Sequence, residues 1–284
     1  APPPAPEPLV QFVDPFIGTG GAGRTFPGAS MPGGLVQLSP DTTGLGRASG
    51  AGYHYADTEI AGFSHTHLSG IPGGDLCDIL VMPTQAGAEM PGQVASPFSH
   101  DREKASPGFY SVDLQAFDIR AELTATRRVG LHRYAFLRPG AGRQPAVLVD
   151  LGSGPDGDEA VETRLMLEGP TTISGYRFSR GQARDQRAFF VARFSTPYQT
   201  WLVGDTSGYS GERRELTAGR ARGLFRFVLR PGQPLQVKVA ISPVSVEGAR
   251  ASLEREAPGW EFDGFRKDAA TAWERKLQRL RIET

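Results

Sequence analysis

The chain has 284 residues, of which 31 are basic and 31 acidic, and no run of like charge stands out. This balance argues against nucleic acid or an anionic membrane as a partner. No apolar stretch approaches the roughly 20 residues of a membrane-spanning helix. The 36 Gly and 23 Pro favour turns and short strands over long helices. The single cysteine, Cys77, excludes an intrachain disulfide, and on this count we also expect no cysteine-based zinc site of any kind.

The first nine residues, APPPAPEPL, have neither helix nor strand potential. We expect residues 1–9 to form a disordered tether of the kind left by signal-peptide cleavage, which would make the protein secreted or periplasmic. The stretch from Asp14 to Gly34 is rich in glycine and lacks periodicity. It should form a long ordered loop or a series of turns, and loops of that length are usually functional.

Strand-like runs then recur along most of the chain. Several alternate apolar and polar residues, as Val237, Val239 and Ile241 do, which is the period of a half-buried strand. The runs cover residues 35–39, 78–83, 108–115, 119–126, 129–137, 146–151, 171–178, 188–195, 198–204, 221–229 and 234–243. Many strands at short spacing, with little helix between them, predict a mainly β protein: a large antiparallel β-sandwich over residues 10–243.

The C-terminal part, residues 244–284, has a different pattern. Helices are predicted over residues 246–256 and 263–282. In the second, a spacing of three or four gives an apolar stripe with charged flanks, formed by Phe265, Ala269, Ala272 or Trp273, Lys276 and Leu280. A helix that closes a sandwich without a partner is unusual, so we expect residues 244–284 to be a helical linker toward another domain.

The densest group of chemically active residues is GFSHTHLSGIPGGDLCD, residues 62–78. His65 and His67 are two residues apart, so on a strand both would face the same side. The pair could bind zinc with a third ligand from elsewhere, hydrogen-bond sugar hydroxyls, or tie a loop to backbone carbonyls. We expect metal binding the least of the three.

The glycine-rich stretch after Asp14 contains a second pattern. Gly18, Gly20 and Gly23 match the G-x-G-x-x-G fingerprint of dinucleotide-binding proteins, but no buried strand leads into it and the sequence FPG at 26–28 breaks any helix. Residues 24–26, Arg-Thr-Phe, could instead form a polar and aromatic ledge for a pyranose ring. Aromatic residues in such loops are as often simple anchors.

Acidic residues are plentiful but show no recognisable catalytic arrangement. Glycoside hydrolysis needs two positioned carboxyl groups, and no such pair can be identified from spacing. The cluster Asp156, Asp158 and Glu159 is interpreted as a solvated turn; it could offer oxygen ligands to calcium but lacks the spacing of an EF-hand. No nucleophile elbow or Ser-His-Asp context is present.

Long segments stand out when the chain is taken as a whole. They include VDPFIGTGG, GRTFPGASMPGGLVQLSPDT, GYHYADTEIAGFSHTHLSG, GGDLCDILVMP, PGFYSVDL, IRAELTATRRVGLHRYAF, VSVEGARASLE and PGWEFDGFR. Together they resemble the N-terminal domain of glycoside hydrolase family 92. The resemblance runs from about Phe12 to Ile282, and its motifs are long and in the expected order.

The family consists of calcium-dependent, inverting exo-α-mannosidases. The resemblance implies that this chain is the N-terminal half of such a secreted hydrolase, acting on terminal α-mannosides of glycans such as N-glycans. It implies a β-sandwich similar to galactose mutarotase, followed by the helical linker and an (α/α)6 catalytic barrel that this sequence does not contain. The general acid, the general base and most calcium ligands are expected on that barrel, so the 284 residues alone should be inactive.

The N-terminal domain of such an enzyme is expected to form one wall of the mannose pocket. The matching loops here are residues 18–28 and 62–75. We expect substrate contacts, and no metal ligands, from Arg24, Phe26, His65, His67, Ser69, Gly73, Gly74 and Asp75. The first loop departs from relatives that carry His and other polar residues before Thr-Phe-Pro-Gly, so linkage specificity stays open.

Two other functions are compatible with the same residues. The chain could be a self-standing carbohydrate-binding β-sandwich, or an aldose epimerase-like enzyme that uses His65 or His67 as acid or base. The half-enzyme hypothesis makes one further structural prediction. It requires an exposed apolar face, centred on the terminal helix and the two glycine-rich loops, for the barrel to cover.

Overall fold

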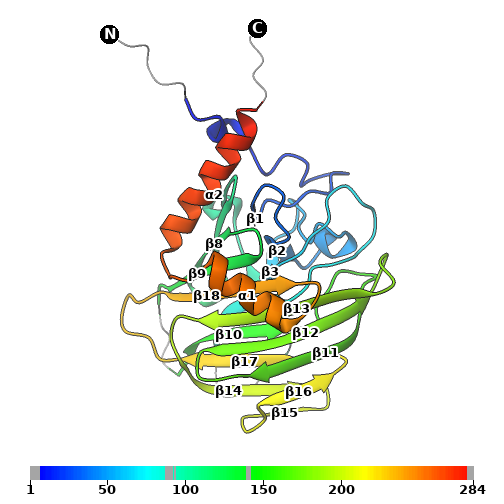
Figure 1. The fold of residues 1–284 in the computed structure, drawn as a ribbon, viewed down its shortest axis with the longest axis vertical. Helices are drawn as coiled ribbons and strands as arrows, with labels where there is room; N and C mark the ends of the chain where they lie inside the picture. Colours follow the sequence, from blue (N-terminus) through cyan, green and yellow to red (C-terminus); the bar gives the residue numbers. More distant parts are fainter. Residues whose placement is uncertain (1–6, 87–91, 93, 139–141, 280–284) are drawn as a thin grey trace.

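The computed structural model describes residues 7–86, 92, 94–138 and 142–279. Within them, two nine-stranded sheets pack face to face and two α-helices follow at the C-terminal end (Figure 1). The predicted mainly β sandwich with a helical C-terminal part is confirmed. In the described residues, no helix is both long and apolar enough to cross a membrane.

The strands of each sheet pair antiparallel. The first sheet contains β1 (Ala29–Ser30), β2 (Gln37–Thr42), β3 (Glu59–Ser64), β4 (Leu80–Ala86), β5 (Ser96–Pro97), β10 (Gln144–Asp150), β14 (Tyr198–Asp205), β15 (Gly208–Ser210) and β17 (Arg222–Phe227). Its order is β1-β2-β3-β4-β10-β17-β14-β15, with β5 paired to β3.

The second sheet contains β6 (Lys104–Ser106), β7 (Phe109–Leu114), β8 (Ile119–Ala125), β9 (Val129–Phe136), β11 (Glu159–Leu167), β12 (Thr172–Arg180), β13 (Gln186–Phe194), β16 (Glu215–Ala218) and β18 (Leu235–Ser242). Its order is β16-β11-β12-β13-β18-β9-β8-β7-β6. Each of the eleven predicted runs overlaps one of these strands. The nine-residue β11 was not predicted, because a β-bulge between Ala160 and Glu162 disrupts its alternation.

The main hydrophobic core lies between the sheets, and a smaller one lies beneath α1 (Val246–Glu256). Ser245 caps this helix by accepting a hydrogen bond from the Gly248 amide, and Ala249 and Leu253 face the second sheet. Because α1 covers the outer face of β18, that strand is buried on both faces. Its lysine, Lys238, donates to the carbonyl of Ala257 just past the helix end, and burial lowers its pKa to about 8.

The second helix, α2 (Phe262–Leu277), packs along β7 and β8 and beside the 3-10 helix η1 (Leu9–Phe12). Trp273 Nε1 donates to the Ser30 carbonyl at 2.7 Å, and Glu274 accepts from the Val10 amide at 2.9 Å. The helix therefore has a partner within this chain. Leu9, the last residue of the predicted tether, already belongs to η1; residues 1–6 of the tether and residues 280–282 of the predicted helix lie outside the described residues.

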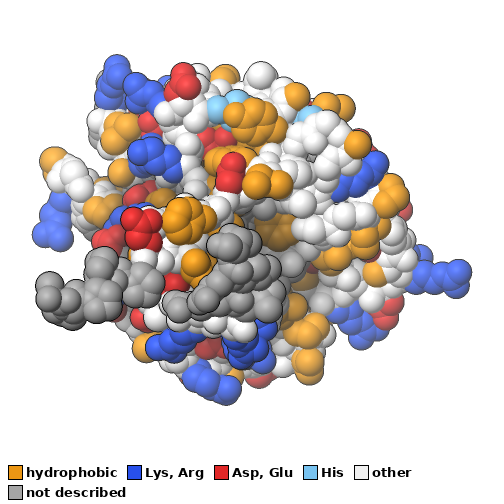
Figure 2. All heavy atoms as spheres, turned by 90° about the horizontal axis from the view of Figure 1, so that it is seen from above, with side chains coloured by type: hydrophobic (Ala, Val, Ile, Leu, Met, Phe, Trp, Pro, Cys, Tyr) orange, Lys and Arg blue, Asp and Glu red, His pale blue; other side chains and the backbone are white. Residues whose placement is uncertain are grey.

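Exposed hydrophobic side chains gather in the N-terminal part of the chain. Of the ten large ones that are exposed in the described residues, six fall before residue 56: Phe12, Val13, Ile17, Leu35, Leu45 and Tyr55. Figure 2 looks onto the end of the molecule where η1 and the last turns of α2 lie, and hydrophobic side chains are interspersed there with charged ones. We predicted an exposed apolar face centred in part on the terminal helix. For α2 this prediction was wrong, because the apolar side of that helix packs against the sandwich.

Candidate functional site

The structure brings the two glycine-rich loops together. The Gly70 amide donates to the Arg24 carbonyl at 2.7 Å, and the Arg24 guanidinium lies 3.4 Å from the Ile71 carbonyl oxygen. The half-buried Phe26 ring packs on the imidazole of His67, with 5.1 Å between the ring centroids. The loops formed by residues 18–28 and by the residues after β3 therefore pack against each other.

His65 belongs to a buried hydrogen-bonded chain that reaches across the sandwich. Its Nδ1 lies 2.8 Å from the Ile79 carbonyl oxygen, which can only accept, so Nδ1 carries the proton. Its Nε2 then accepts from Nε2 of His132 at 3.0 Å, whose Nδ1 accepts from the Tyr134 hydroxyl at 2.7 Å. Burial lowers the pKa of His65 to about 4 and that of His132 well below its ordinary value.

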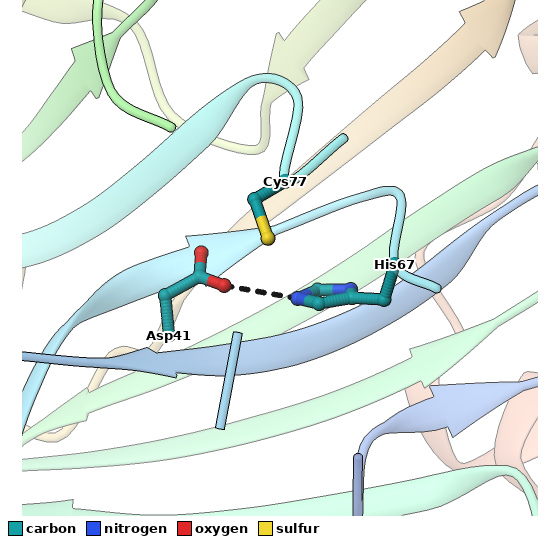
Figure 3. A group of neighbouring side chains, drawn as sticks. All are labelled: Asp41, His67 and Cys77. Atoms are coloured by element: carbon teal, nitrogen blue, oxygen red, sulfur yellow. Dashed lines mark hydrogen bonds and ion pairs between the residues drawn. The ribbon is translucent and has the colours of Figure 1, made fainter. Parts of the chain in front are cut away.

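His67 belongs to a different group. Its Nδ1 lies 2.7 Å from the Gln37 carbonyl oxygen, and its Nε2 lies 2.9 Å from Oδ1 of Asp41 and 3.1 Å from the Ser64 hydroxyl. The sulfur of Cys77 is directed toward the same space (Figure 3). Burial raises the pKa of the Cys77 thiol, and Asp41 beside it adds to the rise.

The two histidines thus make the structural contacts that we considered as an alternative to sugar binding. They follow β3, which ends at Ser64, so strand alternation does not place them, and each ties its loop to a backbone carbonyl. Their exposed fractions are 0% for His65 and 1% for His67. Burial gives no support to an epimerase that uses either imidazole as a solvent-accessible acid or base.

The remaining predicted site residues divide by accessibility. Ser69 and Gly73 are exposed at the loop tip, whereas Gly74 and Asp75 are buried. A side chain at Gly74 would meet the Asp156 carbonyl oxygen at 2.2 Å, so its close approach is to another loop of this chain. The Asp75 carboxylate accepts from the amides of Leu76 and Ala183 and anchors the loop to the β12–β13 hairpin.

The acidic cluster after β10 is only partly the solvated turn that we predicted. Asp156 and Glu159 are exposed, but the Asp158 side chain is fully buried and pairs with Arg177. Arg177 also donates to Asp78 at 2.7 Å, and all three side chains are inaccessible to solvent. Burial raises the pKa of Asp158, and Arg177 opposes that rise. The prediction was wrong for Asp158 because its buried environment is formed by Arg177 and Asp78, which come from other segments of the chain and are not indicated by the sequence around Asp158.

Sequence reasoning also missed His132 and the shallow cavity beside the first loop. His132 lies on the same inward face of β9 as Gly130 and Tyr134. A histidine at an inward position of a predicted strand was the signal that could have indicated a buried polar contact. The cavity, of about 420 Å³, is lined by Asp14, Phe16, Ile17, Thr19, Gly20, Tyr55, His100 and Glu103. In it the exposed Tyr55 ring stacks on His100 with 3.9 Å between centroids, offering an aromatic face of the kind that sugars contact.

Calcium does not fit the residues that the structure describes. Calcium takes six to eight oxygen ligands. The metal-ligand cluster found among the described side chains is Asp41, His67 and Cys77, which offers nitrogen and sulfur as well as oxygen. Asp158 is engaged by Arg177, and Asp156 lies 3.5 Å from the Arg47 guanidinium.

The comparisons with known proteins place the chain in a family. Residues 12–242 match the glycosyl hydrolase family 92 N-terminal domain. The chain belongs to glycosyl hydrolase family 92, and the resemblance noted in its sequence is confirmed.

Solved and curated relatives cover nearly the whole chain. It superposes with a TM-score of 0.89 and 30% identity on the family GH92 alpha-mannosidase BT3965 from Bacteroides thetaiotaomicron, over 99% of this chain and 39% of that one. The same enzyme has also been solved with mannoimidazole bound. The GH92 glycosyl hydrolase ccman5 gives a TM-score of 0.86 at 32% identity, over 97% of this chain and 38% of that one.

A curated relative from Arthroderma benhamiae, an uncharacterized secreted glycosidase, is 26% identical over 97% of this chain. The chain spans 39% of that relative's length, and 38 to 39% of the two solved enzymes. These relatives therefore contain a large part that the present 284 residues do not include.

Proposed function

We propose that these 284 residues are the N-terminal part of a secreted or periplasmic exo-α-mannosidase that releases terminal mannose from glycans. The observation that carries the proposal is the match of residues 12–242 to a family whose solved relative at 30% identity is an alpha-mannosidase. A relative described as a secreted glycosidase supports export. The chain would contribute a wall of the mannose pocket, and the further part of the protein would contribute the catalytic carboxyl groups.

The environment of the buried carboxylates supports this division. Hydrolysis needs an acid and a base that are free to exchange protons. Asp78 and Asp158 are bound to Arg177, and Glu103 accepts from the hydroxyls of Tyr53 and Tyr110. These three side chains stabilise the sandwich, which supports a division in which the catalytic carboxyl groups lie in the further part of the protein. Calcium, for which the described residues provide no suitable site, would be held mainly by that same further part.

The accessible members of the predicted site would contact substrate directly. These are Ser69 and Gly73 at the loop tip, with the half-buried Arg24 and Phe26 beside them. The buried members, His65, His67, Gly74 and Asp75, would hold the loop in position. The residues at the loop tip would therefore contact the substrate, and the buried residues beneath them would keep the loop in place.

The first test is mannose release from α-1,2-mannobiose. We expect none from the 284-residue chain, and chelator-sensitive release from the full-length protein. Calcium-dependent release by the short chain would show that the catalytic carboxyl groups lie within it. Failure of the full-length protein on every α-mannoside would reject the mannosidase proposal, and mannose binding by the short chain would then favour a self-standing carbohydrate-binding module.

A matched pair of variants tests the loop tip in the full-length protein. Ser69→Trp should lower kcat/KM by at least about tenfold, because a large side chain at the tip would block the pocket entrance. Thr206→Trp, at a position in the β14–β15 turn that is also exposed, is the control and should leave kcat/KM unchanged. Equal kcat/KM values for the two variants would remove Ser69 from the site.

A further inference from the structure

The hydrogen bonds of His67 leave an electrostatic conflict at its second nitrogen. The Gln37 carbonyl oxygen can only accept, so Nδ1 of His67 must carry a proton. In a neutral imidazole Nε2 then has no proton and can only accept. It nevertheless lies 2.9 Å from Oδ1 of Asp41, which is also an acceptor. Two acceptors at that distance repel each other unless a cation lies between them. That cation is either a proton, carried by the imidazole or by the carboxyl group, or a metal ion.

Two further features favour a metal ion. Oδ2 of Asp41 is buried without a hydrogen-bond partner among the described residues. A cavity of about 20 Å³, lined in part by Asp41, Gly52 and Cys77, adjoins the carboxylate. That volume holds about one water molecule. The sulfur of Cys77 supplies a third donor, and the donor atoms of the three residues lie within 4.8 Å of one another (Figure 3).

We propose that Asp41, His67 and Cys77 bind a transition-metal dication of the zinc class, with water from the adjoining cavity as the fourth ligand. A mixed set of oxygen, nitrogen and sulfur donors suits zinc and does not suit calcium. The contact from Nδ1 to the Gln37 carbonyl is the outer-shell hydrogen bond that commonly orients a metal-bound histidine. One thiolate is enough for such a site, so the single cysteine was not a sufficient reason to exclude it.

The geometry requires only small adjustments. Donor atoms around a tetrahedral zinc ion lie roughly 3.3 to 3.7 Å apart, as its bond lengths dictate. The carboxylate must therefore withdraw slightly from the imidazole, and the thiol, which already lies within 4.8 Å of both, must settle at that separation. The three ligands come from β2, from the segment after β3 and from the segment before β4. The ion would join these three segments at the base of the loop formed by residues 62–75, and the site does not depend on mannosidase activity.

Cobalt titration of the chelator-treated 284-residue chain tests the site directly. We expect one Co²⁺ per chain, with a sulfur-to-cobalt charge-transfer band that one equivalent of Zn²⁺ removes. Cys77→Ser should abolish the band, and His67→Gln should weaken binding by at least about tenfold, the loss that even outer-shell changes cause. His100→Gln is the matched control, because His100 also pairs with a carboxylate, that of Glu103, and should leave the band intact.

Two outcomes would overturn the proposal. The first is no stoichiometric binding by the folded wild-type chain, because the cation between His67 and Asp41 would then be a proton. The second is a band that survives Cys77→Ser. If the variants do not fold, X-ray absorption of the zinc-loaded wild-type chain decides the matter, since the site requires one sulfur neighbour and the rest nitrogen or oxygen.

Discussion

Arg177 is the largest fully buried side chain in the described part of the molecule, and its charge is neutralised only by Asp78 and Asp158. Asp78 is also held by the Thr66 hydroxyl at 2.8 Å. This triad connects β12 to the segment before β4 and to the loop before β11. Its net contribution depends on all three members being present, because an unpaired buried charge is far more costly than a buried pair.

Arg177→Met should therefore lower the free energy of unfolding by about 3–5 kcal/mol, since two buried carboxylates lose their partner. Urea denaturation of the 284-residue chain measures the change. Arg187→Met is the control: that arginine pairs with Asp185 at an exposed position, so its loss should change the free energy of unfolding far less than the loss of Arg177. Similar losses in both variants would contradict the structural role assigned to the triad.

The buried pair His65 and His132 predicts a pH dependence of stability. Both imidazoles are neutral in the folded state, and burial lowers the pKa of His65 from 6.5 to about 4. Above pH 6.5 His65 is unprotonated in both the folded and the unfolded state, so it does not lower the free energy of unfolding there. As pH falls from 6.5 toward 4 only the unfolded state takes it up, and His65 alone removes up to about 1.4 kcal/mol per pH unit.

Denaturation curves at pH 8, 6.5, 5.5 and 4.5 would measure this loss. His132→Leu should make the decline below pH 6.5 shallower, because it removes one of the two buried imidazoles. Its stability relative to wild type at pH 8 provides the baseline. An unchanged decline in the variant would assign the acid sensitivity to other groups.

At the scale of elements, the candidate site depends on loops packed against loops. Gly74 lies against the backbone of Asp156, which leaves no room for a side chain. Gly74→Ala should push the two loops apart and destabilise the chain by about 1–3 kcal/mol. Gly219→Ala is the control, because no atom lies within 4 Å of its added carbon and its backbone is not left-handed. It should be neutral or slightly stabilising.

Hydrogen exchange distinguishes local from global effects of Gly74→Ala. The amides of residues 70–78 should exchange faster than in wild type, while those of β13 and β18 in the core should change little at neutral pH. Protection that is retained throughout residues 70–78 would show that the loop accommodates the extra carbon without moving.

At the scale of the whole molecule, the hydrophobic side chains near the N-terminus are the feature that a further domain would explain. Phe12 and Ile17 are 69% and 75% exposed. The double variant Phe12→Ser, Ile17→Ser should reduce self-association of the 284-residue chain, because it removes exposed apolar surface. Each change should alter the free energy of unfolding by no more than about 0.5 kcal/mol.

Light scattering with size-exclusion chromatography measures the association. Val228→Ser, Val244→Ser is the matched control, since those residues are 63% and 78% exposed but lie outside the N-terminal group. An equal effect of the two double variants would show that the N-terminal group is not a preferred contact surface.

Short-range patterns in the sequence determined much of the fold. Helix α1 begins and ends at the predicted residues, because its cap Ser245 and the spacing of Ala249 and Leu253 are signals within one short window. The strands with regular alternation were predicted for the same reason. β11 was not, since its bulge shifts the alternation. Membership of the family was also visible in the sequence, because its motifs are long and contiguous.

Tertiary structure alone decided which polar side chains meet. His65 lies 67 residues from His132, and Arg177 lies 99 residues from Asp78. Such contacts follow from strand order and register, which local patterns do not specify. The same applies to burial. The sequence predicted that residues 62–75 belong to a site, but only the packing of the sheets showed that His65 and His67 are buried beneath the loop while Ser69 is exposed at its tip.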